Sequence, residues 1–198
     1  MIAYDLIGQT PLVLLESFSD ENVKIYAKLE QFNPGGSIKD RLGKYLIEKA
    51  IDEGRLKEGD TIVEATAGNT GIGLAIASNR HKVKCIIFAP EGFAEEKISI
   101  MKALGADVRR TPKVEGMTGA QQEALAYATR YGYLYMNQFE TKDNPGAYTQ
   151  TLAKQLTDEL SHIDYFVAGV GSGGTFTGVA QHLKTYDVKN YIVEPEGS

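Results

Sequence analysis

The sequence has a single cysteine, three histidines and no tryptophan in 198 residues. One cysteine excludes a disulfide within the chain, and Cys85 lies in the apolar run of residues 83–88, where we expect a buried, unreactive thiol on a strand. His81, His162 and His182 do not have the spacing of metal ligands. The sequence therefore predicts no metal site.

The chain also lacks an excess of basic residues and any long apolar run. It has 21 Lys and Arg against 26 Asp and Glu, a formal net charge of -5. Such a chain has no field that attracts nucleic acid or an anionic membrane. No apolar run approaches the ~20 residues of a membrane span, and no basic segment followed by an apolar one marks a secretory signal. We expect a cytoplasmic protein without nucleic-acid or membrane partners.

Segments that alternate in the manner of strands recur between segments with helical spacing. Because helices of ordinary length separate the strands, we expect right-handed βαβ units around a mainly parallel sheet, an α/β fold. The residues alone predict one continuous α/β domain. The expected strands cover residues 23–30, 61–64, 83–89, 107–110, 133–136, 165–170 and 191–194. The expected helices begin near Lys39 and then cover residues 75–80, 94–104, 119–131, 148–160 and 176–184.

The stretch Asn33-Pro34-Gly35-Gly36-Ser37-Ile38-Lys39-Asp40-Arg41 places one lysine at the start of a helix. Asn-Pro and Gly-Gly end the preceding strand, and Ser37 is the expected N-cap, with Asp40 as a short-acid variant of the capping box. In the first helical turn, the helix dipole and burial both lower the pKa of a lysine. Lys39 could then be a Schiff-base nucleophile. The alternative is a surface lysine paired with an acid.

A glycine-rich loop at residues 169–175 joins an expected strand to an expected helix, so its backbone N–H groups form an anion site. Gly169, Gly171 and Gly174 satisfy the dinucleotide template Gly-x-Gly-x-x-Gly, and Glu194 stands where a ribose-binding acid would. That template normally opens its nucleotide domain, and it leaves the lysine stretch unexplained. A tight turn without a ligand is the remaining alternative. Residues 64–73 form a second such loop, which suits a carboxylate.

The lysine stretch resembles the pyridoxal 5′-phosphate (PLP) motif of the cysteine synthase and cystathionine β-synthase family, the fold-type II PLP enzymes related to the tryptophan synthase β subunit. The string Gly8-Gln9-Thr10-Pro11-Leu12 is similar to another motif of the family. The resemblance implies two parallel-sheet α/β domains, a smaller substrate-binding domain of residues 42–141 and a larger PLP-binding domain of residues 1–41 and 142–198. It also implies that the C-terminal part of the larger domain is absent here, together with the residue that faces the pyridine nitrogen.

In this family the matching lysine binds PLP, so the resemblance implies that role for Lys39. The string Gly-Ser-Gly-Gly-Thr resembles the family's phosphate cup, which favours PLP over a dinucleotide. By the same resemblance, Asn69 would bond the 3′-hydroxyl of PLP. The residues implied to hold the phosphate are Gly171, Ser172, Gly173, Gly174 and Thr175.

The second loop resembles the family's Thr-Ser-Gly-Asn-Thr-Gly motif, which holds the carboxylate of the amino-acid substrate. The resemblance implies that role for Thr66, Gly68 and Thr70, and Gln138 matches a glutamine that the family uses for the same carboxylate. Ala67 stands where serine is commoner. The form with alanine looks more like the members that make cystathionine, which puts ordinary cysteine synthesis in doubt.

The implied activity is a PLP-dependent β-replacement, a transferase or lyase reaction of amino-acid biosynthesis. An activated serine such as O-acetylserine would react with sulfide or homocysteine to give cysteine or cystathionine, in a homodimer when the protein is of full length. One alternative is a serine or threonine dehydratase of the same fold, which product analysis would distinguish. An alternative of another class is a truncated, non-catalytic fragment that binds PLP or a partner, which the intact mass of the natural gene product would reveal.

Overall fold

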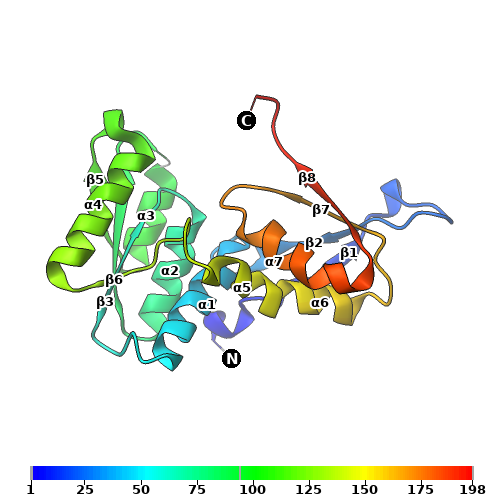
Figure 1. Ribbon diagram of the computed structural model, residues 1–198, viewed down its shortest axis with the longest axis horizontal. Coiled ribbons are helices and arrows are strands. Elements are labelled where there is room, and N and C mark those ends of the chain that lie inside the picture. Colours follow the sequence, from blue (N-terminus) through cyan, green and yellow to red (C-terminus); the bar gives the residue numbers. More distant parts are fainter. Residues whose placement is uncertain (1, 94, 198) are drawn as a thin grey trace.

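The strands of this protein form three separate sheets in a computed structural model that describes residues 2–93 and 95–197 (Figure 1). Ala94, the expected first residue of one helix, and the terminal residues of the expected larger domain, Met1 and Ser198, lie outside the described residues. The molecule is elongated, with the largest sheet at one end and the two smaller sheets at the other (Figure 1).

The largest sheet is four-stranded and parallel, with strand order β5-β4-β3-β6. α2 and α3 cover one face, where α1 packs on α2, and α4 covers the other (Figure 1). The prediction of helical crossovers around a mainly parallel sheet is confirmed here. The strands are β3 (Thr61–Ala65), β4 (Lys84–Pro90), β5 (Asp107–Thr111) and β6 (Leu134–Tyr135). The helices are α1 (Lys39–Asp52), α2 (Asn69–Arg80), α3 (Glu95–Ala103) and α4 (Gly116–Tyr131).

The direction of travel through this sheet reverses beside β3. The chain runs outward from β3 to β4 and β5, and then returns through α4 to β6 on the other side of β3. In open parallel sheets, ligands bind outside the carboxyl ends of the strands at such a switch point. The loops that follow β3 and β6 both begin there, so the topology marks this edge as a candidate binding site.

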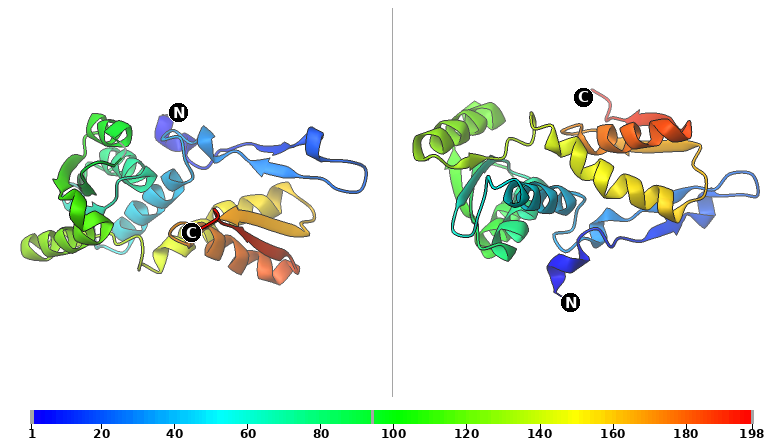
Figure 2. Two further views of the ribbon diagram at one scale, coloured as in Figure 1. Left: turned by 90° about the horizontal axis from the view of Figure 1, so that it is seen from above. Right: turned by 60° about the horizontal axis from the view of Figure 1, so that its bottom comes forward.

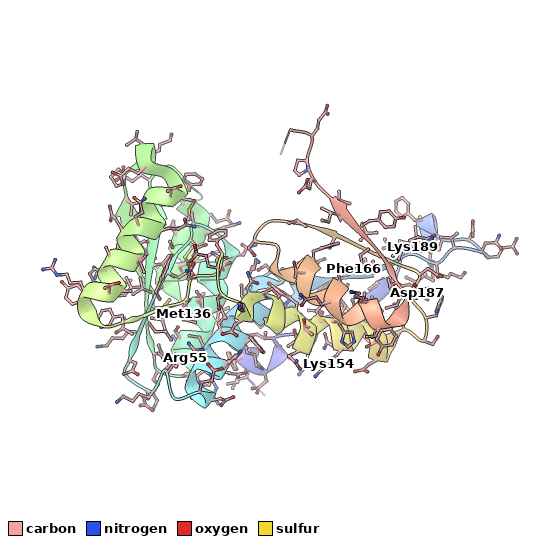
Figure 3. The ribbon with its side chains drawn as sticks, viewed as in Figure 1. Arg55, Met136, Lys154, Phe166, Asp187 and Lys189 are labelled. Atoms are coloured by element: carbon pink, nitrogen blue, oxygen red, sulfur yellow. The ribbon has the colours of Figure 1, made fainter. Side chains whose placement is uncertain are left out.

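The other end of the molecule holds two two-stranded sheets. β7 (Tyr165–Gly169) and β8 (Lys189–Val193) are parallel, while β1 (Leu12–Leu14) and β2 (Tyr26–Lys28) are antiparallel and form an arm at the same end (Figure 2). The side chain of Phe166, a residue of β7, faces α7, and its ring centroid lies 6.0 Å from that of Phe176 (Figure 3). The helices here are α5 (Asp143–Gln150), α6 (Leu152–Glu159) and α7 (Gly174–Leu183). Short 3-10 helices cover Ala3–Leu6, Glu16–Phe18, Glu30–Phe32, Lys113–Glu115 and Lys184–Tyr186.

Several element boundaries differ from the sequence-based expectation. The helix expected at residues 148–160 is two helices, because the backbone departs from helical angles at Thr151, with φ -120° and ψ -78°. α5 begins at Asp143, before the helix expected from residue 148, since Pro145 lies in its first turn, where a helix does not need the missing N–H. α2 and α7 also begin earlier than expected, because glycine-rich starts carry no helical signal. The strand expected at residues 23–30 is only the three residues of β2.

The four-stranded sheet lies within residues 42–141, and the two smaller sheets lie in the flanking ranges. The division into two domains at those boundaries stays a prediction. Cys85 is a free thiol buried in β4, as expected, and burial raises its pKa to about 12, which makes it a poor nucleophile. None of the helices in the described part of the chain is long and apolar enough to cross a bilayer.

Candidate active site

The backbone of Lys39 is fixed by the contact between α1 and α2. A Cβ added to Gly43 would overlap the backbone of Gly73, and one added to Gly73 would overlap the carbonyl of Lys39. The two helices therefore touch at their backbones, which only glycine permits at these positions. Because α2 begins at the loop after β3, this contact sets the position of Lys39 relative to that loop.

The turn before Lys39 is held differently from the expected capping box. Ile38, not Ser37, occupies the N-cap position of α1, and its backbone angles are already helical. The Ser37 hydroxyl accepts a hydrogen bond from the backbone N–H of Lys39 at 3.2 Å. The Asp40 carboxylate accepts one from the N–H of Gly35, so it holds the glycine turn instead of the Ser37 amide. The predicted cap was therefore wrong in its partners, although both side chains do stabilise the start of the helix.

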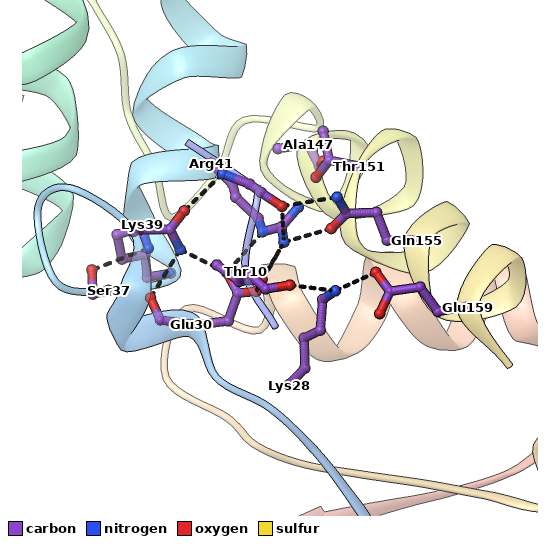
Figure 4. A network of polar contacts seen from close by, with 12 residues as sticks. Thr10, Lys28, Glu30, Ser37, Lys39, Arg41, Ala147, Thr151, Gln155 and Glu159 are labelled. Atoms are coloured by element: carbon purple, nitrogen blue, oxygen red, sulfur yellow. Dashed lines mark hydrogen bonds and ion pairs between the residues drawn. The ribbon is translucent and has the colours of Figure 1, made fainter. Parts of the chain in front are cut away.

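A buried polar network lies beside the lysine turn (Figure 4). Arg41 Nε and Nη2 donate to the two oxygens of Glu30 at 2.7 and 2.9 Å, a bidentate ion pair. Burial raises the pKa of Glu30, but hydrogen bonding and charge from Arg41 outweigh this and hold that pKa below its ordinary value. Arg41 also donates to Gly8 O and Thr10 Oγ1, both at 3.0 Å. The N-terminal motif and the lysine stretch thus belong to one hydrogen-bonded network.

The amine of Lys39 points at the glycine loop that precedes α7. Lys39 Nζ donates to Ser172 Oγ at 3.2 Å and lies 5.7 Å from the centre of the Tyr148 ring. Burial lowers the pKa of Lys39 below its ordinary value, the direction that favours a neutral amine. The structure therefore joins two of the residues expected to bind the cofactor.

A chain of hydrogen bonds continues from Ser172 to the residues expected to bind the substrate. Asn144 Nδ2 donates to Ser172 Oγ at 3.1 Å and to Gln138 O at 2.7 Å. Gln138 Oε1 in turn accepts from Thr70 Oγ1 at 2.6 Å. Asn144 was not anticipated from the sequence. A buried asparagine in the first turn of α5 has no motif of its own, and only its contacts reveal that it bridges the two predicted sites.

The loop before α7 has the form of an anion cradle. Gly173 has φ +81° and is the N-cap of α7, whose first N–H groups have no partner inside the helix. A Cβ added to Gly171 would meet no atom within 4 Å, whereas one added to Gly174 would overlap Asn144 Oδ1. Open backbone amides, the Ser172 hydroxyl and the half-buried amine of Lys39 fit an aldehyde that carries a phosphate, which is the chemistry of PLP.

The loop after β3 is ordered by its own side chains. Thr66 Oγ1 accepts from the backbone N–H of Gly68 at 3.1 Å, and Thr70 is buried in the first turn of α2. Asn69 is the first residue of α2, while Ala67 is half-buried in the loop before it. The structure brings Thr70 and Gln138 together; the binding roles of all these residues stay predictions.

Glu64 is a second residue that sequence reasoning did not single out. Its carboxylate is fully buried at the end of β3 and accepts hydrogen bonds from the backbone N–H groups of Ala65 at 2.8 Å and Gln138 at 3.0 Å. Burial raises its pKa to about 7. The available signal was an acidic residue in a strand with no other charge, Thr61-Ile62-Val63-Glu64-Ala65.

Comparisons with known proteins agree with this geometry. The sequence matches the model of the family described as pyridoxal-phosphate dependent enzyme over residues 3–198. It is 50% identical over 199 residues to the O-acetylserine dependent cystathionine beta-synthase of Bacillus subtilis (strain 168), covering 98% of this chain and 65% of that one. It is 47% identical over 205 residues to the cysteine synthase of Helicobacter pylori (strain ATCC 700392 / 26695), covering 98% and 66%.

Among solved structures, the O-acetylserine dependent cystathionine beta-synthase from Helicobacter pylori matches with a TM-score of 0.93 and 46% identity, covering 100% of this chain and 68% of that one. The chain thus spans about two thirds of the length of the curated relatives it matches. The resemblance stated from the motifs is confirmed: the chain belongs to the family of pyridoxal-phosphate-dependent enzymes and has their fold-type II architecture.

Proposed function

We propose that this chain supplies the cofactor-binding and substrate-binding residues for a β-replacement reaction. An activated serine such as O-acetylserine would react with sulfide or homocysteine to give cysteine or cystathionine. The observation that carries the proposal is the hydrogen-bond chain that runs from Lys39 through Ser172 and Asn144 to Gln138 and Thr70. It connects the lysine expected to carry the cofactor to the side chains expected to hold the amino acid.

Lys39 would carry PLP, and the first turn of α7 would hold its phosphate through the amides of residues 171–175. Asn69 would bond its 3′-hydroxyl. When bound, PLP supplies an electron sink that stabilises negative charge at the Cα of the substrate. The glycine contact between α1 and α2 would position Lys39, and the N-terminus of α7 would attract the negatively charged phosphate.

The amine of Lys39 would also move the proton. A general base must be unprotonated and within reach of the group that it deprotonates. Burial lowers the pKa of Lys39, and Ser172 Oγ accepts from its Nζ at 3.2 Å, which orients the amine within the site. Once released from the cofactor, Lys39 Nζ would take the proton from Cα.

The α-carboxylate of the substrate would bind at the switch point between β3 and β6. The N-terminus of α2 attracts a negative charge, and the Thr70 hydroxyl and the Gln138 amide offer hydrogen-bonding groups. Thr66 and Gly68 complete the proposed set. Ala67 adds no hydroxyl next to these groups, and the resemblance of this loop to the members that make cystathionine keeps homocysteine among the proposed acceptors. Sulfide and homocysteine both stay open as acceptors.

Product analysis tests this function directly. The protein would be loaded with PLP and incubated with O-acetylserine in the presence of sulfide, of homocysteine, or of neither. We expect cysteine or cystathionine by mass spectrometry, and no product from the Lys39→Ala variant. A keto acid as the main product in all three incubations would instead support the dehydratase. The homodimer and the cytoplasmic location stay predictions, and sedimentation would test the first.

A further inference from the structure

Glu64 is a buried carboxyl group that has no part in the proposed reaction. It lies near the end of β3 and is fully buried. Burial of a carboxylate is costly, so buried acids usually have a cation beside them. In residues 2–93 and 95–197 no cation forms an ion pair with Glu64; its two oxygens accept backbone amides instead, from Ala65 and from Gln138. Both carboxylate oxygens of Glu64 are therefore used as acceptors for backbone N–H groups.

The two amides lie on both sides of the switch point: Ala65 is the last residue of β3, and Gln138 lies in the loop that follows β6. The ladder between β3 and β6 ends with the bond from Met136 N to Val63 O, 3.0 Å long. The hydrogen bond from Gln138 N to Glu64 attaches the loop that follows β6 to β3 two residues beyond Met136. Glu64 thus fixes the backbone of Gln138, while Thr70 holds its side chain.

We propose that Glu64 is a positioning residue for recognition of the amino acid: its carboxylate anchors the Gln138 backbone so that the Gln138 and Thr70 side chains are preset to bind the substrate's α-carboxylate. The inference rests on the proposed function, which assigns those two side chains to the substrate. Two acceptor oxygens are needed, one for each amide. A glutamine in place of Glu64 has one carbonyl oxygen and would turn an N–H donor toward the second amide.

Protonation of Glu64 would remove one acceptor in the same way. Burial raises the pKa of Glu64 to about 7, although its two backbone hydrogen bonds act in the opposite direction. Two titratable groups lie close enough to Glu64 for its negative charge to raise their pKa: Tyr135 on β6 and Cys85 on β4. Burial raises the pKa of both groups, so both stay neutral while Glu64 changes its charge near pH 7.

The first experiment follows the backbone amides of Ala65 and Gln138 by NMR as the pH is changed. We expect both amide signals to shift together, with one midpoint well above the ~4.3 of an ordinary glutamate, because both donate to the same carboxylate. In the Glu64→Gln variant neither amide should titrate. Amides that titrate at the ordinary value, or do not titrate in the wild type, would overturn the proposed anchor.

The second experiment measures binding of L-alanine, which has an α-carboxylate but no β-leaving group, to the PLP-loaded protein by calorimetry. Glu64→Gln should weaken this binding by about tenfold or more, the usual effect of losing a hydrogen bond to a charged group. Affinity for PLP itself should change less than about twofold, since the loop before α7 does not touch Glu64. Glu91→Gln is the matched control, because Glu91 is an exposed acid directly after the neighbouring strand β4.

The pH profile separates positioning from general support of the fold. Wild-type affinity for L-alanine should fall more steeply than that of Glu64→Gln as the pH is lowered through about 7. Equal affinities of the two proteins at every pH would overturn the proposal. A wild-type protein that binds neither PLP nor L-alanine overturns the proposed function, and the amide titration then distinguishes that failure from a failure of the Glu64 anchor.

Discussion

The two predicted binding loops rest on sheets that differ in how well they are covered. The substrate loop follows β3, whose five residues are all buried between helices on both faces. The cofactor loop follows β7, which within the described part of the chain pairs with β8 alone and is covered by α7 on one face. Tyr165, Val167, Ile192 and Val193 on these two strands are each at least half exposed.

This difference in coverage implies that the four-stranded sheet is more stable than the sheet of β7 and β8. A parallel sheet with both faces covered has its own core, so the substrate loop has a rigid base. Apolar strand residues that face solvent contribute little to stability and mark a surface that associates readily. We call the four-stranded sheet with its helices one region, and the β7–β8 sheet with α7 the other. Lys39 links the two regions, because its backbone packs on α2 and its amine contacts Ser172.

The largest expected effect is loss of the cofactor link in Lys39→Ala. Alanine is a good helix former, so the start of α1 and the packing of both regions should persist. The visible absorption band of bound PLP should disappear, while the far-UV circular dichroism should match the wild type. Lys57→Ala is the control, since Lys57 is exposed and lies in a turn after α1. A variant that keeps the band would assign the cofactor to another lysine.

Truncating one isoleucine in the four-stranded sheet and one in the β7–β8 sheet tests whether the two sheets differ in stability. Ile87 in β4 is fully buried, so Ile87→Ala should lower the free energy of unfolding by about 2–5 kcal/mol. Ile192 in β8 is 50% exposed, and Ile192→Ala should change it by no more than about 0.5 kcal/mol. Urea unfolding measures both. Equal costs would show that β8 is as well packed as the four-stranded sheet.

Gly171→Val should weaken PLP binding without unfolding either region. A side chain there enters space that is open in the protein, beside the amides proposed to bind phosphate. We expect at least about a tenfold loss of PLP affinity, or ~1.4 kcal/mol, and no change in the urea midpoint. Valine at Gly173 or Gly174 should also weaken binding, but φ +81° at the first and Asn144 beside the second add strain. Tight NAD binding without PLP binding would favour the dinucleotide alternative.

The pH dependence of stability should reveal the buried acid of the four-stranded sheet. The folded-state pKa of Glu64 is raised to about 7, so the folded protein keeps a proton that the unfolded chain releases. The contribution of Glu64 to stability therefore falls as pH rises from the ordinary glutamate value toward about 7. Urea unfolding at both ends of this window should show a smaller decrease in Glu64→Gln. An identical decrease in both proteins would contradict the raised pKa.

The smallest expected effect is that of Ala67→Ser. An added hydroxyl next to the substrate loop should contribute on the order of 1 kcal/mol, and we expect it to shift preference toward sulfide. The measurement is the ratio of kcat/KM for sulfide to that for homocysteine in both proteins. An unchanged ratio would remove Ala67 as a determinant of the acceptor.

The sequence predicted the parts of this molecule whose signals are local. Strand periodicity and helix spacing located the parallel sheet, and short motifs indicated the lysine turn and both glycine loops. Glu64 and Asn144 were missed because their roles arise from contacts between loops that are far apart in the chain. The early start of α5 was missed because asparagine and proline usually indicate a turn, although a first helical turn also accepts them.

The division into domains is not predictable from local signals for the same reason. Strands β3 to β8 alternate with helices throughout, so periodicity gives no sign that β7 leaves the four-stranded sheet and pairs elsewhere. Strand pairing is decided by contacts between distant segments. Similarly, the partner of the Asp40 carboxylate depends on the path of the glycine turn, which the spacing of a capping box does not specify.

The central claim is that Lys39 carries the cofactor at the junction of the two regions. The most direct test is to load the protein with PLP, reduce it with borohydride and identify the modified peptide by mass spectrometry. Lys39 is held by Gly73 from one region and Ser172 from the other, so we predict a pyridoxyl group on that lysine. A pyridoxyl group on any other lysine, with Lys39 unmodified, would contradict it.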